Sequence, residues 1–515
     1  MERNDLKKVK RIYWASGIVS ICGIIFEVLF GALGSYVLGD GVKQYTITIS
    51  LFLTGMGIGA FLSEKVLSRL MNVFIWVEFA VALIGGFSAL FMFGASAYLP
   101  AGTDALYLYV VILLVGVLTG LELPILIRKA NEIGVAVNKS TARVLFSDYA
   151  GGLIGGILFI LWLRPAFGLV KTAFLVAVAN AAVALWTVIT FRDEIKRPRT
   201  YGTIGVLVLL LLTTGAFLGD EAAFSFEQKL YRDPIIFSED SQYQHIVMTK
   251  EQGDLRLYLN GNLQFSSVDE FRYHEVLVHP AMALADEPHD VLILGGGDGL
   301  AAREVLKYKS VHQLTLVDLD PAMTHLAKTD PMLTALNHDS LHDPRVSVIH
   351  EDAFQYLKTN RGLYDVILID LPDPNSISLN KLYSREFYEL VRNHLAPTGA
   401  MMVQATSPVF ATKVYWTINK TVESADLYTQ NLHVDVPSFG NWGFVFAARH
   451  PFQVKAWQIP VKTRFLKSSM IPSLTKFGKD EDADIVDDGE RYVFQPNTLS
   501  HPNLIRLYQQ AWRHY

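Results

Sequence analysis

The stretch Val291–Leu300, which reads VLILGGGDGL, decides the fold of the second half of the chain. An apolar run without helical periodicity is typical of a buried strand, and the glycines after it allow a tight turn and a close backbone approach to a ligand. A second apolar run ends in Asp318, about twenty residues after Asp298. In nucleotide-binding βαβ units an acid at that separation binds ribose hydroxyls. The pattern predicts a nucleotide-like ligand, with an ordinary strand-to-helix connection as the alternative.

The acid within this glycine-rich turn predicts the charge of the ligand. Sites for phosphate groups keep such a turn free for backbone N–H donors, because these donors and the helix N-terminus attract anions. Asp298 places a negative charge there. We therefore expect a cationic ligand rather than a pyrophosphate.

The composition indicates more than one domain. A chain of 515 residues is too long for one ordinary core, and its hydrophobic content of 51% is concentrated in the first part of the sequence. The net charge of -5 gives no support for nucleic acid as a partner. The single cysteine, Cys22, excludes a disulfide within one chain.

The first 220 residues predict a multi-pass α-helical membrane domain, with the lipid bilayer as its partner. A helix needs about 20 apolar residues to cross a bilayer. Seven stretches meet or approach this length, and no cleavable signal peptide precedes them. The stretches are Ile12–Leu38, Tyr45–Leu62, Val73–Phe93, Ala105–Ile127, Tyr149–Leu163, Phe167–Phe191 and Ile204–Leu218, of which the fifth and seventh are short.

Lysine and arginine alternate between the predicted loops, and this pattern predicts the orientation. They cluster before the first stretch and in every second loop after it. By the positive-inside rule we expect a cell-membrane protein with a cytoplasmic N-terminus. Seven crossings would leave everything after Asp220 outside the cytoplasm, and one miscounted stretch would reverse this. Three acids, Glu27, Glu78 and Glu122, lie in or near the stretches, either on a path for cations or at the interface.

The remaining sequence predicts three further parts. Residues 221–280 form a small β-strand subdomain, 281–455 an α/β doubly wound domain, and 456–515 a C-terminal extension. Alternating strand and helix patterns support the doubly wound, Rossmann-like fold. Strands are expected at Gln242–Thr249, Leu255–Leu259, Leu263–Phe265, Asp290–Leu294, Gln313–Val317, Val346–His350, Asp365–Ile369 and Ala400–Gln404, followed by a hairpin of Tyr428–Val436 and Gly443–Ala448.

Local capping explains some of the residues at the start of the helix expected near Glu270, but not the residues that follow. Ser267 and Glu270 have the spacing of a capping box, and Glu270 and His274 are placed as a pair one helical turn apart. Capping does not explain Tyr273 or His279.

Acidic residues follow the predicted parallel strands. Because the carboxyl ends of parallel strands meet at one edge of a sheet, we expect these acids to gather there. They would repel one another unless something positive lies among them. The acids are Asp298, Asp318, Asp352, Asp370 and Asp373. The edge therefore predicts a cation-binding site.

Together these motifs resemble the spermidine synthase family of polyamine aminopropyltransferases. The resemblance runs from about Gln242 to Ala448, and the first half resembles the multi-pass segment fused to some bacterial members. The residues that carry it are Leu259-Asn260-Gly261 with Gln264, Asp269-Glu270 with Tyr273-His274-Glu275, Gly295-Gly296-Gly297-Asp298-Gly299, Val317-Asp318-Leu319-Asp320, Asp352-Ala353, Tyr364-Asp365-Val366-Ile367, Asp370-Leu371-Pro372-Asp373-Pro374 and Leu382-Tyr383 with Phe387-Tyr388.

The resemblance implies a methyltransferase-type catalytic domain that transfers an aminopropyl group from decarboxylated S-adenosylmethionine to putrescine or a related amine. The nucleoside sulfonium is a co-substrate, and neither a prosthetic group nor a metal is implied. We also expect a homo-oligomer. The implied roles are Asp370 as proton acceptor, Asp373 on the amine, Asp298 and His274 along the aminopropyl channel, Gln244, Asp318, Asp352 and Ala353 on the nucleoside, and Tyr273 and Gln264 as further substrate-binding residues.

Chemical reasoning supports the central roles. An ammonium must lose a proton before its nitrogen can attack, and Asp370 is the expected base. Asp298 would repel the carboxylate of intact S-adenosylmethionine. Asn260, Leu300 and the segment after Pro374 depart from the family pattern, so the identity of the acceptor amine stays open. A methyltransferase, or a polyamine transporter or sensor without turnover, are the alternatives.

Overall fold

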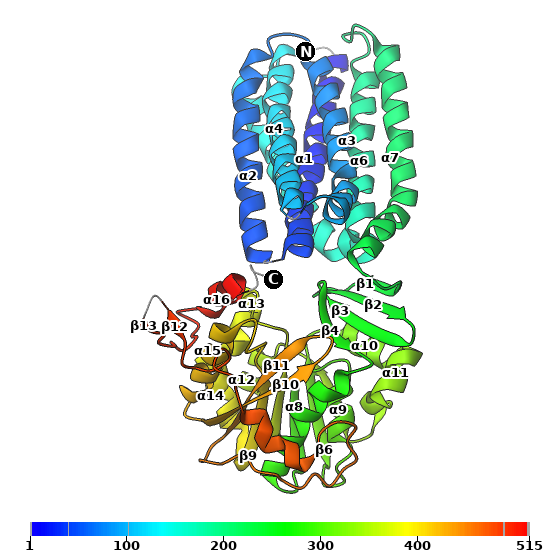
Figure 1. The fold of residues 1–515 in the computed structure, drawn as a ribbon. Helices are drawn as coiled ribbons and strands as arrows, with labels where there is room; N and C mark the ends of the chain where they lie inside the picture. Colours follow the sequence, from blue (N-terminus) through cyan, green and yellow to red (C-terminus); the bar gives the residue numbers. More distant parts are fainter. Residues whose placement is uncertain (1–2, 40, 101, 488–489, 512–515) are drawn as a thin grey trace. The chain divides into compact units, whose positions relative to one another are not determined.

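The computed structural model describes residues 3–39, 41–100, 102–487 and 490–511. The chain divides into two compact units, Met1–Pro234 and Ile235–Tyr515, which are drawn in Figure 1. We describe each unit by itself. The first is built from helices only, and the second contains the strands of the two larger sheets.

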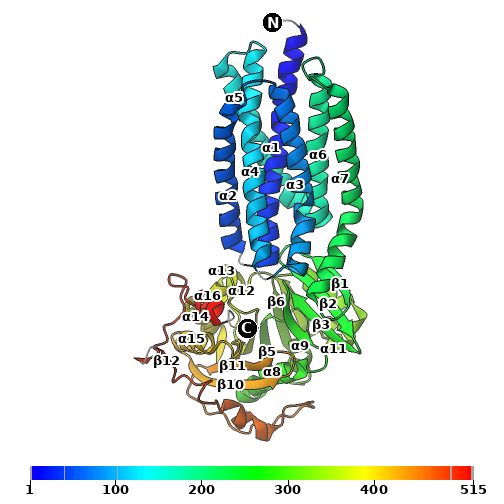
Figure 2. The ribbon, with the colours of Figure 1, turned by 45° about the horizontal axis from the view of Figure 1, so that its top comes forward.

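Among the described residues of the first unit, the chain forms seven α-helices, which are drawn in Figure 2. Small residues allow them to pack closely, as expected for apolar bundles. A Cβ atom at Gly151 would lie 2.5 Å from the carbonyl oxygen of Gly17, and one at Gly155 would lie 2.7 Å from that of Ile21. The helices are α1 (Arg3–Leu38), α2 (Gly41–Leu62), α3 (Leu70–Tyr98), α4 (Thr103–Glu132), α5 (Val137–Leu158), α6 (Arg164–Thr190) and α7 (Pro198–Glu227).

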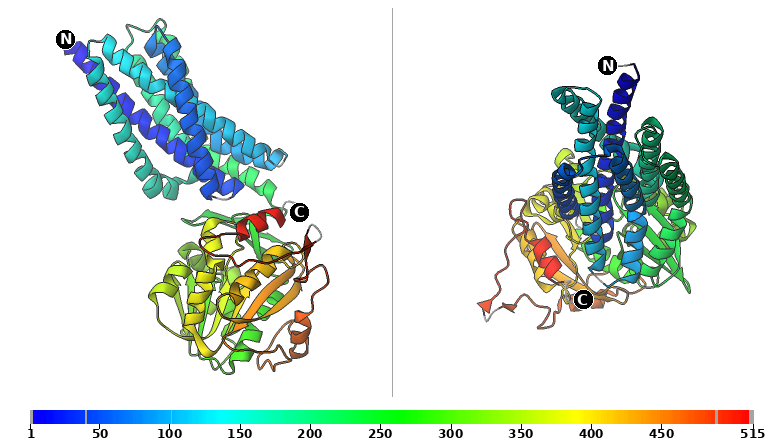
Figure 3. Two further views of the ribbon diagram at one scale, coloured as in Figure 1. Left: turned by 90° about the vertical axis from the view of Figure 1, so that its left-hand side faces the viewer. Right: turned by 90° about the horizontal axis from the view of Figure 1, so that it is seen from above.

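Among the described residues, six helical stretches are long and apolar enough to cross a membrane. One of them, Val137–Thr190, contains both α5 and α6. Gly168 has a non-helical backbone, with φ 65° and ψ -168°, so the chain kinks near the start of α6. Figure 3 gives two further views of the helices. The predicted boundary at residue 220 falls inside α7, because polar residues near its end do not interrupt its backbone hydrogen bonds.

A four-stranded antiparallel sheet opens the second unit, in the order β1-β2-β3-β4. Two tight turns shape it, since Gln252 and Gly253, and likewise Asn260 and Gly261, all have positive φ. The predicted strands are present, and β1 was not predicted. The strands are β1 (Ile235–Asp240), β2 (His245–Glu251), β3 (Asp254–Leu259) and β4 (Asn262–Ser266).

The doubly wound sheet confirms the predicted fold. Its order is β10-β11-β9-β8-β5-β6-β7, with β9, β8, β5, β6 and β7 parallel and the hairpin β10–β11 antiparallel. The strands are β5 (Asp290–Gly295), β6 (Gln313–Asp318), β7 (Val346–His350), β8 (Tyr364–Asp370), β9 (Leu395–Gln404), β10 (Tyr428–Val436) and β11 (Gly440–Ala448).

Helices cover both faces of this sheet. Val291 and Ile293 belong to one buried cluster, whereas Leu292 and Leu294 belong to another, as the alternation of side chains along a strand requires. The first cluster includes residues of α8 (Glu270–Ala285), α9 (Leu300–Val305), α10 (Pro321–Thr329) and α11 (Pro331–Asn337). The second includes residues of α12 (Ala353–Thr359), α14 (Arg385–His394), α15 (Thr412–Glu423) and α16 (Leu504–Ala511).

The predicted capping box at the start of α8 is wrong. The Ser267 hydroxyl accepts a hydrogen bond from the Leu255 N–H at 2.8 Å and does not cap the helix. Glu270 instead binds Arg303 through two hydrogen bonds of 2.9 Å each. Ser267 and Glu270, which local spacing assigned to a cap, therefore bind residues of β3 and α9 instead.

Candidate functional site

The glycine-rich turn brings β5 against the end of β8. Gly295 pairs with Asp370 in the sheet and has φ 85°. A Cβ atom at position 295 would lie 2.1 Å from the Asp370 carbonyl oxygen, so only glycine fits. The next residue, Gly296, donates its N–H to the same oxygen at 3.1 Å. The sequence predicted that these glycines let the backbone come close to a ligand. In the structure, Gly295 and Gly296 also let it come close to the end of β8.

Asp318 lies at the end of β6, as predicted. Its carboxylate accepts hydrogen bonds from the N–H groups of Gly297 at 3.0 Å and Asp320 at 2.8 Å. Burial raises the pKa of Asp318 to about 6. The Gln244 amide donates to Asp320 at 2.9 Å. The sequence interpretation named Asp320 in a motif but gave it no role; in the structure it joins the small β sheet to the doubly wound domain.

Asp352 and Ala353 lie at the start of α12. Asp352 caps the helix by accepting a hydrogen bond from the Phe354 N–H at 3.0 Å, and Ala353 is buried. A salt bridge of 2.7 Å joins Asp352 to Lys381, which the sequence interpretation missed. Lys381 opens the short 3-10 helix η5 (Lys381–Tyr383), which follows α13 (Ile377–Asn380). The segment between Asp373 and α14 therefore reaches one of the predicted nucleoside-binding residues.

Asp370 is held by a tyrosine. The hydroxyl of Tyr273, on α8, donates to the Asp370 carboxylate at 2.5 Å. Burial, together with the charges of Asp370 and Asp373, raises the pKa of Tyr273. Tyr273 is therefore a neutral hydrogen-bond donor at physiological pH, and it fixes the orientation of the carboxylate that it contacts.

Asp373 is held from β9 and the residues after it. Gln404 ends β9 and donates to one Asp373 oxygen at 3.2 Å, and the Thr406 hydroxyl donates to the other at 3.0 Å. Thr406 has φ 61°, which is rare for a β-branched residue and costs conformational energy. Burial raises the pKa of Asp373, and these donors oppose that effect. The rule that found the acids also applies to Gln404, because it ends a parallel strand.

His274 supplies the positive charge at this edge. Its Nδ1 atom lies 2.8 Å from the Glu270 carbonyl oxygen, which can only accept, so Nδ1 carries hydrogen. Burial lowers the pKa of His274, but the hydrogen bond and charge of Glu270 outweigh it and raise the pKa to about 9. Burial raises the pKa of Asp298 to about 6, an effect that the charge of His274 opposes. At neutral pH the site therefore holds a cationic histidine and an ionised Asp298.

The three central acids lie in one neighbourhood. His274 interacts electrostatically with both Asp298 and Asp370. Tyr273 interacts with both Asp370 and Asp373. All three carboxylates are partly open to solvent. The structure thus brings Asp298, Asp370 and Asp373 together, as predicted.

Gln264 is placed differently. It lies on β4, and its amide donates to the Asn262 carbonyl oxygen at 3.1 Å within the same hairpin. This contact serves the local strand. Its proposed part in substrate binding rests on the motif alone.

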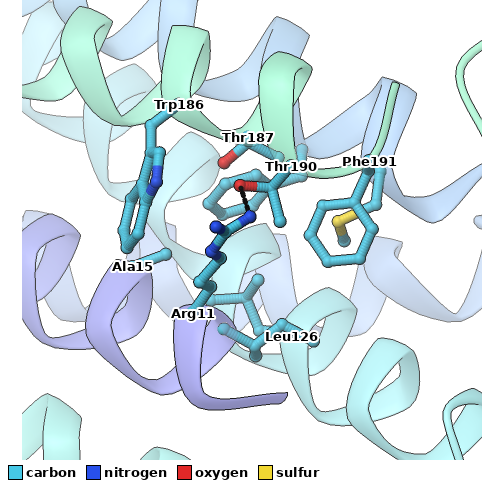
Figure 4. A pocket seen from close by; sticks show the side chains of 10 residues that line it. Arg11, Ala15, Leu126, Trp186, Thr187, Thr190 and Phe191 are labelled. Atoms are coloured by element: carbon cyan, nitrogen blue, oxygen red, sulfur yellow. Dashed lines mark hydrogen bonds between the residues drawn. The ribbon is translucent and has the colours of Figure 1, made fainter. Parts of the chain in front are cut away.

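A small cavity occurs in the helical unit (Figure 4). Its volume is about 10 Å³, room for about one water molecule, and Arg11 reaches Thr190 across it at 3.4 Å. It is therefore too small for an organic substrate. Within the described part of the chain, no group of three or more histidine, cysteine, aspartate or glutamate side chains is arranged to hold a metal ion.

Comparisons with known proteins found relatives of this chain. A family model described as the spermine/spermidine synthase domain matches residues 270–455. A polyamine aminopropyltransferase of Oceanobacillus iheyensis is 63% identical over 510 residues, covering 99% of each chain. Polyamine aminopropyltransferase 1 of Streptomyces coelicolor is 43% identical, covering 97% of this chain and 94% of its own. A solved spermidine synthase bound to the transition-state analogue AdoDATO is 24% identical over 47% of this chain and 85% of its own, with a TM-score of 0.45.

Proposed function

Because this chain belongs to the polyamine aminopropyltransferase family, we propose that it transfers the aminopropyl group of decarboxylated S-adenosylmethionine to putrescine or a related amine. The observation that carries this proposal is the shared neighbourhood of Asp298, Asp370 and Asp373 beside cationic His274. The charge of His274 is also paired with Glu270, so the three carboxylates leave an excess of negative charge, which favours a substrate with several ammonium groups.

The proposed reaction assigns the proton to Asp370. The amine nitrogen forms a bond to the carbon next to sulfur, and the carbon–sulfur bond breaks to leave 5′-methylthioadenosine. Asp370 accepts the proton that the attacking ammonium loses. The hydrogen bond from Tyr273 at 2.5 Å holds the base in place. Asp373 pairs with the second ammonium of a diamine and so aligns the attacking nitrogen, which is a positioning effect.

Asp298 and Asp318 are proposed to recognise the donor. Asp298 would pair with the ammonium of the aminopropyl group and would repel the carboxylate of intact S-adenosylmethionine. Asp318 would accept hydrogen bonds from the ribose hydroxyls. Gln244 and Asp352 would contact the nucleoside, with Ala353 against the adenine.

One assay tests this function. Purified full-length protein is incubated with putrescine and either decarboxylated or intact S-adenosylmethionine, and methylthioadenosine and the amine products are quantified. We expect spermidine and methylthioadenosine with the decarboxylated donor only. Transfer of a methyl group from the intact donor would identify a methyltransferase, and tight binding without product would identify a binding protein; either result contradicts the proposal.

We further propose that the helical unit spans the cell membrane. Its outer surface carries large apolar side chains, among them Leu161 and Phe217, which are 73% and 75% exposed. Salt bridges join Lys8, Lys129 and Glu194, so the start of α1, the end of α4 and the connection after α6 share one basic end of the bundle. By the positive-inside rule this end is cytoplasmic. With seven crossings, the chain after α7 emerges on the opposite side.

Cysteine labelling in sealed vesicles tests this orientation. A Cys22→Ala background removes the single native thiol. Lys196→Cys, in the exposed connection before α7, and Glu251→Cys, at the exposed end of β2, are then added separately. An impermeant maleimide should label the two positions from opposite sides of the membrane. Labelling of both from the same side would contradict seven crossings.

A further inference from the structure

The C-terminal extension packs beside the acid cluster. Leu504 and Leu507 of α16 are buried and share a core with Leu382 and Tyr383. Helix α16 contacts both α15 and α13, and Figure 1 shows it in red beside α13. The matched family domain ends at residue 455, so this helix lies outside it. An element that the domain does not include thus contacts the segment that follows Asp373.

Asn497 fixes that segment. It is fully buried, and its amide nitrogen donates to the carbonyl oxygens of Asn380 at 3.2 Å and Tyr383 at 3.0 Å. Its amide oxygen accepts a hydrogen bond from the Asn503 N–H at 3.1 Å, next to the start of α16. One side chain therefore joins α13, η5 and the C-terminal helix, and each of its polar atoms has a partner.

Tyr508 reaches an acid of the site directly. Its hydroxyl forms a side-chain hydrogen bond with Asp373. Burial and the charge of Asp373 raise the pKa of Tyr508, so this group stays neutral and donates. Together with Gln404 and Thr406, Tyr508 is one of three donors to Asp373. A carboxylate has about four positions for accepting hydrogen bonds, so about one is left for a substrate ammonium.

We infer that the C-terminal helix is part of the amine-binding site, with Tyr508 as a positioning residue that orients Asp373 and Asn497 as one that shapes the segment between Asp373 and α14. The ligand class is a linear aliphatic diamine whose distal ammonium takes the remaining position on Asp373. This inference rests on the proposed function. It adds that the extension, and not the family domain alone, determines the affinity for the acceptor amine.

Steady-state kinetics of full-length Tyr508→Phe test the inference. Gln509→Ala is the matched control, because Gln509 is exposed on the same helix. For Tyr508→Phe we expect the KM for putrescine to rise about tenfold, the effect of losing one hydrogen bond to a charged group. The kcat and the KM for the donor should stay within about twofold, since neither the base nor the nucleoside contacts change. The control should match the wild type in all three constants.

A second variant addresses the segment. Asn497→Asp keeps the size of the side chain but removes the two donated hydrogen bonds, and it should also raise the KM for putrescine. If this variant does not fold, Tyr508→Phe decides. An unchanged KM for putrescine in a folded, active Tyr508→Phe enzyme overturns the inference and leaves the proposed function intact. A wild-type protein without amine-dependent release of methylthioadenosine overturns the proposed function, and the inference with it.

Discussion

The carboxylates at the edge of the doubly wound sheet and the acid pair Glu78–Glu122 of the helical unit lie in different surroundings. At the edge of the doubly wound sheet, Asp298 and Asp370 lie near cationic His274 and remain partly open. In the helical unit, Glu78 on α3 and Glu122 on α4 are 0% and 4% exposed. Glu78 accepts a hydrogen bond of 2.7 Å from the Asn180 amide and forms another with Glu122.

The partners explain the difference. Two carboxyl groups can share a hydrogen bond only when one of them carries a proton. The described partners of Glu78 are an amide and a second acid, and neither of them carries a positive charge. At the sheet edge, backbone N–H groups and a cation stabilise ionised carboxylates. Of these two environments, the sheet edge is the one that keeps negative charge available for an ammonium.

The largest effect is expected at the proposed base. Asp370→Asn removes the proton acceptor but keeps the size of the side chain. We expect turnover to fall by about 10³-fold, within the range of general-base catalysis. The measurement is the rate of methylthioadenosine release at saturating substrates, with the melting temperature as the check on folding. A residual rate near that of the wild type would remove Asp370 from the mechanism.

His274 should affect stability in a pH-dependent way. Its folded pKa of about 9 lies above its ordinary value of 6.5. The charged histidine therefore stabilises the fold fully below pH 6.5, and this contribution is lost as the pH rises through 9. His274→Gln should cost at most on the order of 3 kcal/mol at pH 6 and clearly less at pH 9.5. Thermal unfolding at the two pH values measures this; an equal cost at both would contradict a charged His274.

Asp298 should determine the choice of donor. Asp298→Asn is expected to reduce the preference for the decarboxylated donor by about 100-fold, as for the loss of one partner of a charge pair. In the wild type the KM for the donor should rise below pH 6, where Asp298 becomes protonated and neutral. Asp318, whose pKa is also about 6, adds a second proton, so the variant should retain a weaker pH dependence. A variant with wild-type selectivity would assign donor choice elsewhere.

The smallest effect is expected in the helical unit. Glu78→Gln replaces an acid whose described partners are an amide and a second acid by an amide of the same size. Turnover should stay within about twofold of the wild type, and the melting temperature should change little, because no buried charge loses its partner. This variant is also the matched control for Asp370→Asn, since both convert a carboxylate to an amide. A collapse of turnover would show that the two acid groups are coupled.

The sequence predicted what depends on local pattern. Strand ends gave Asp298, Asp318 and Asp370 their positions, because parallel strands place their carboxyl ends together. The Asn260-Gly261 turn was predicted from residues that tolerate positive φ. Both are properties of neighbouring residues. They do not require knowledge of contacts across the domain.

The remaining part of the site depends on contacts between distant segments. Nothing near Tyr508 marks it as a partner of Asp373, since α16 is an ordinary amphipathic helix in sequence. Lys381 and Asp352 are likewise separated by β8. Spacing misassigned Glu270 as a cap, because local rules cannot foresee the competing Arg303. Tertiary partners override local preference at these positions.

The contact between Gly295 and the Asp370 carbonyl oxygen limits how this enzyme can diverge. Any larger residue at position 295 would push away the strand end that carries the proposed base, so fold and chemistry are constrained by the same atom pair. A change in acceptor preference therefore requires substitutions at other residues, which can vary without moving Asp370. The segment after Asp373 and the helix that packs on it are the natural places for such change.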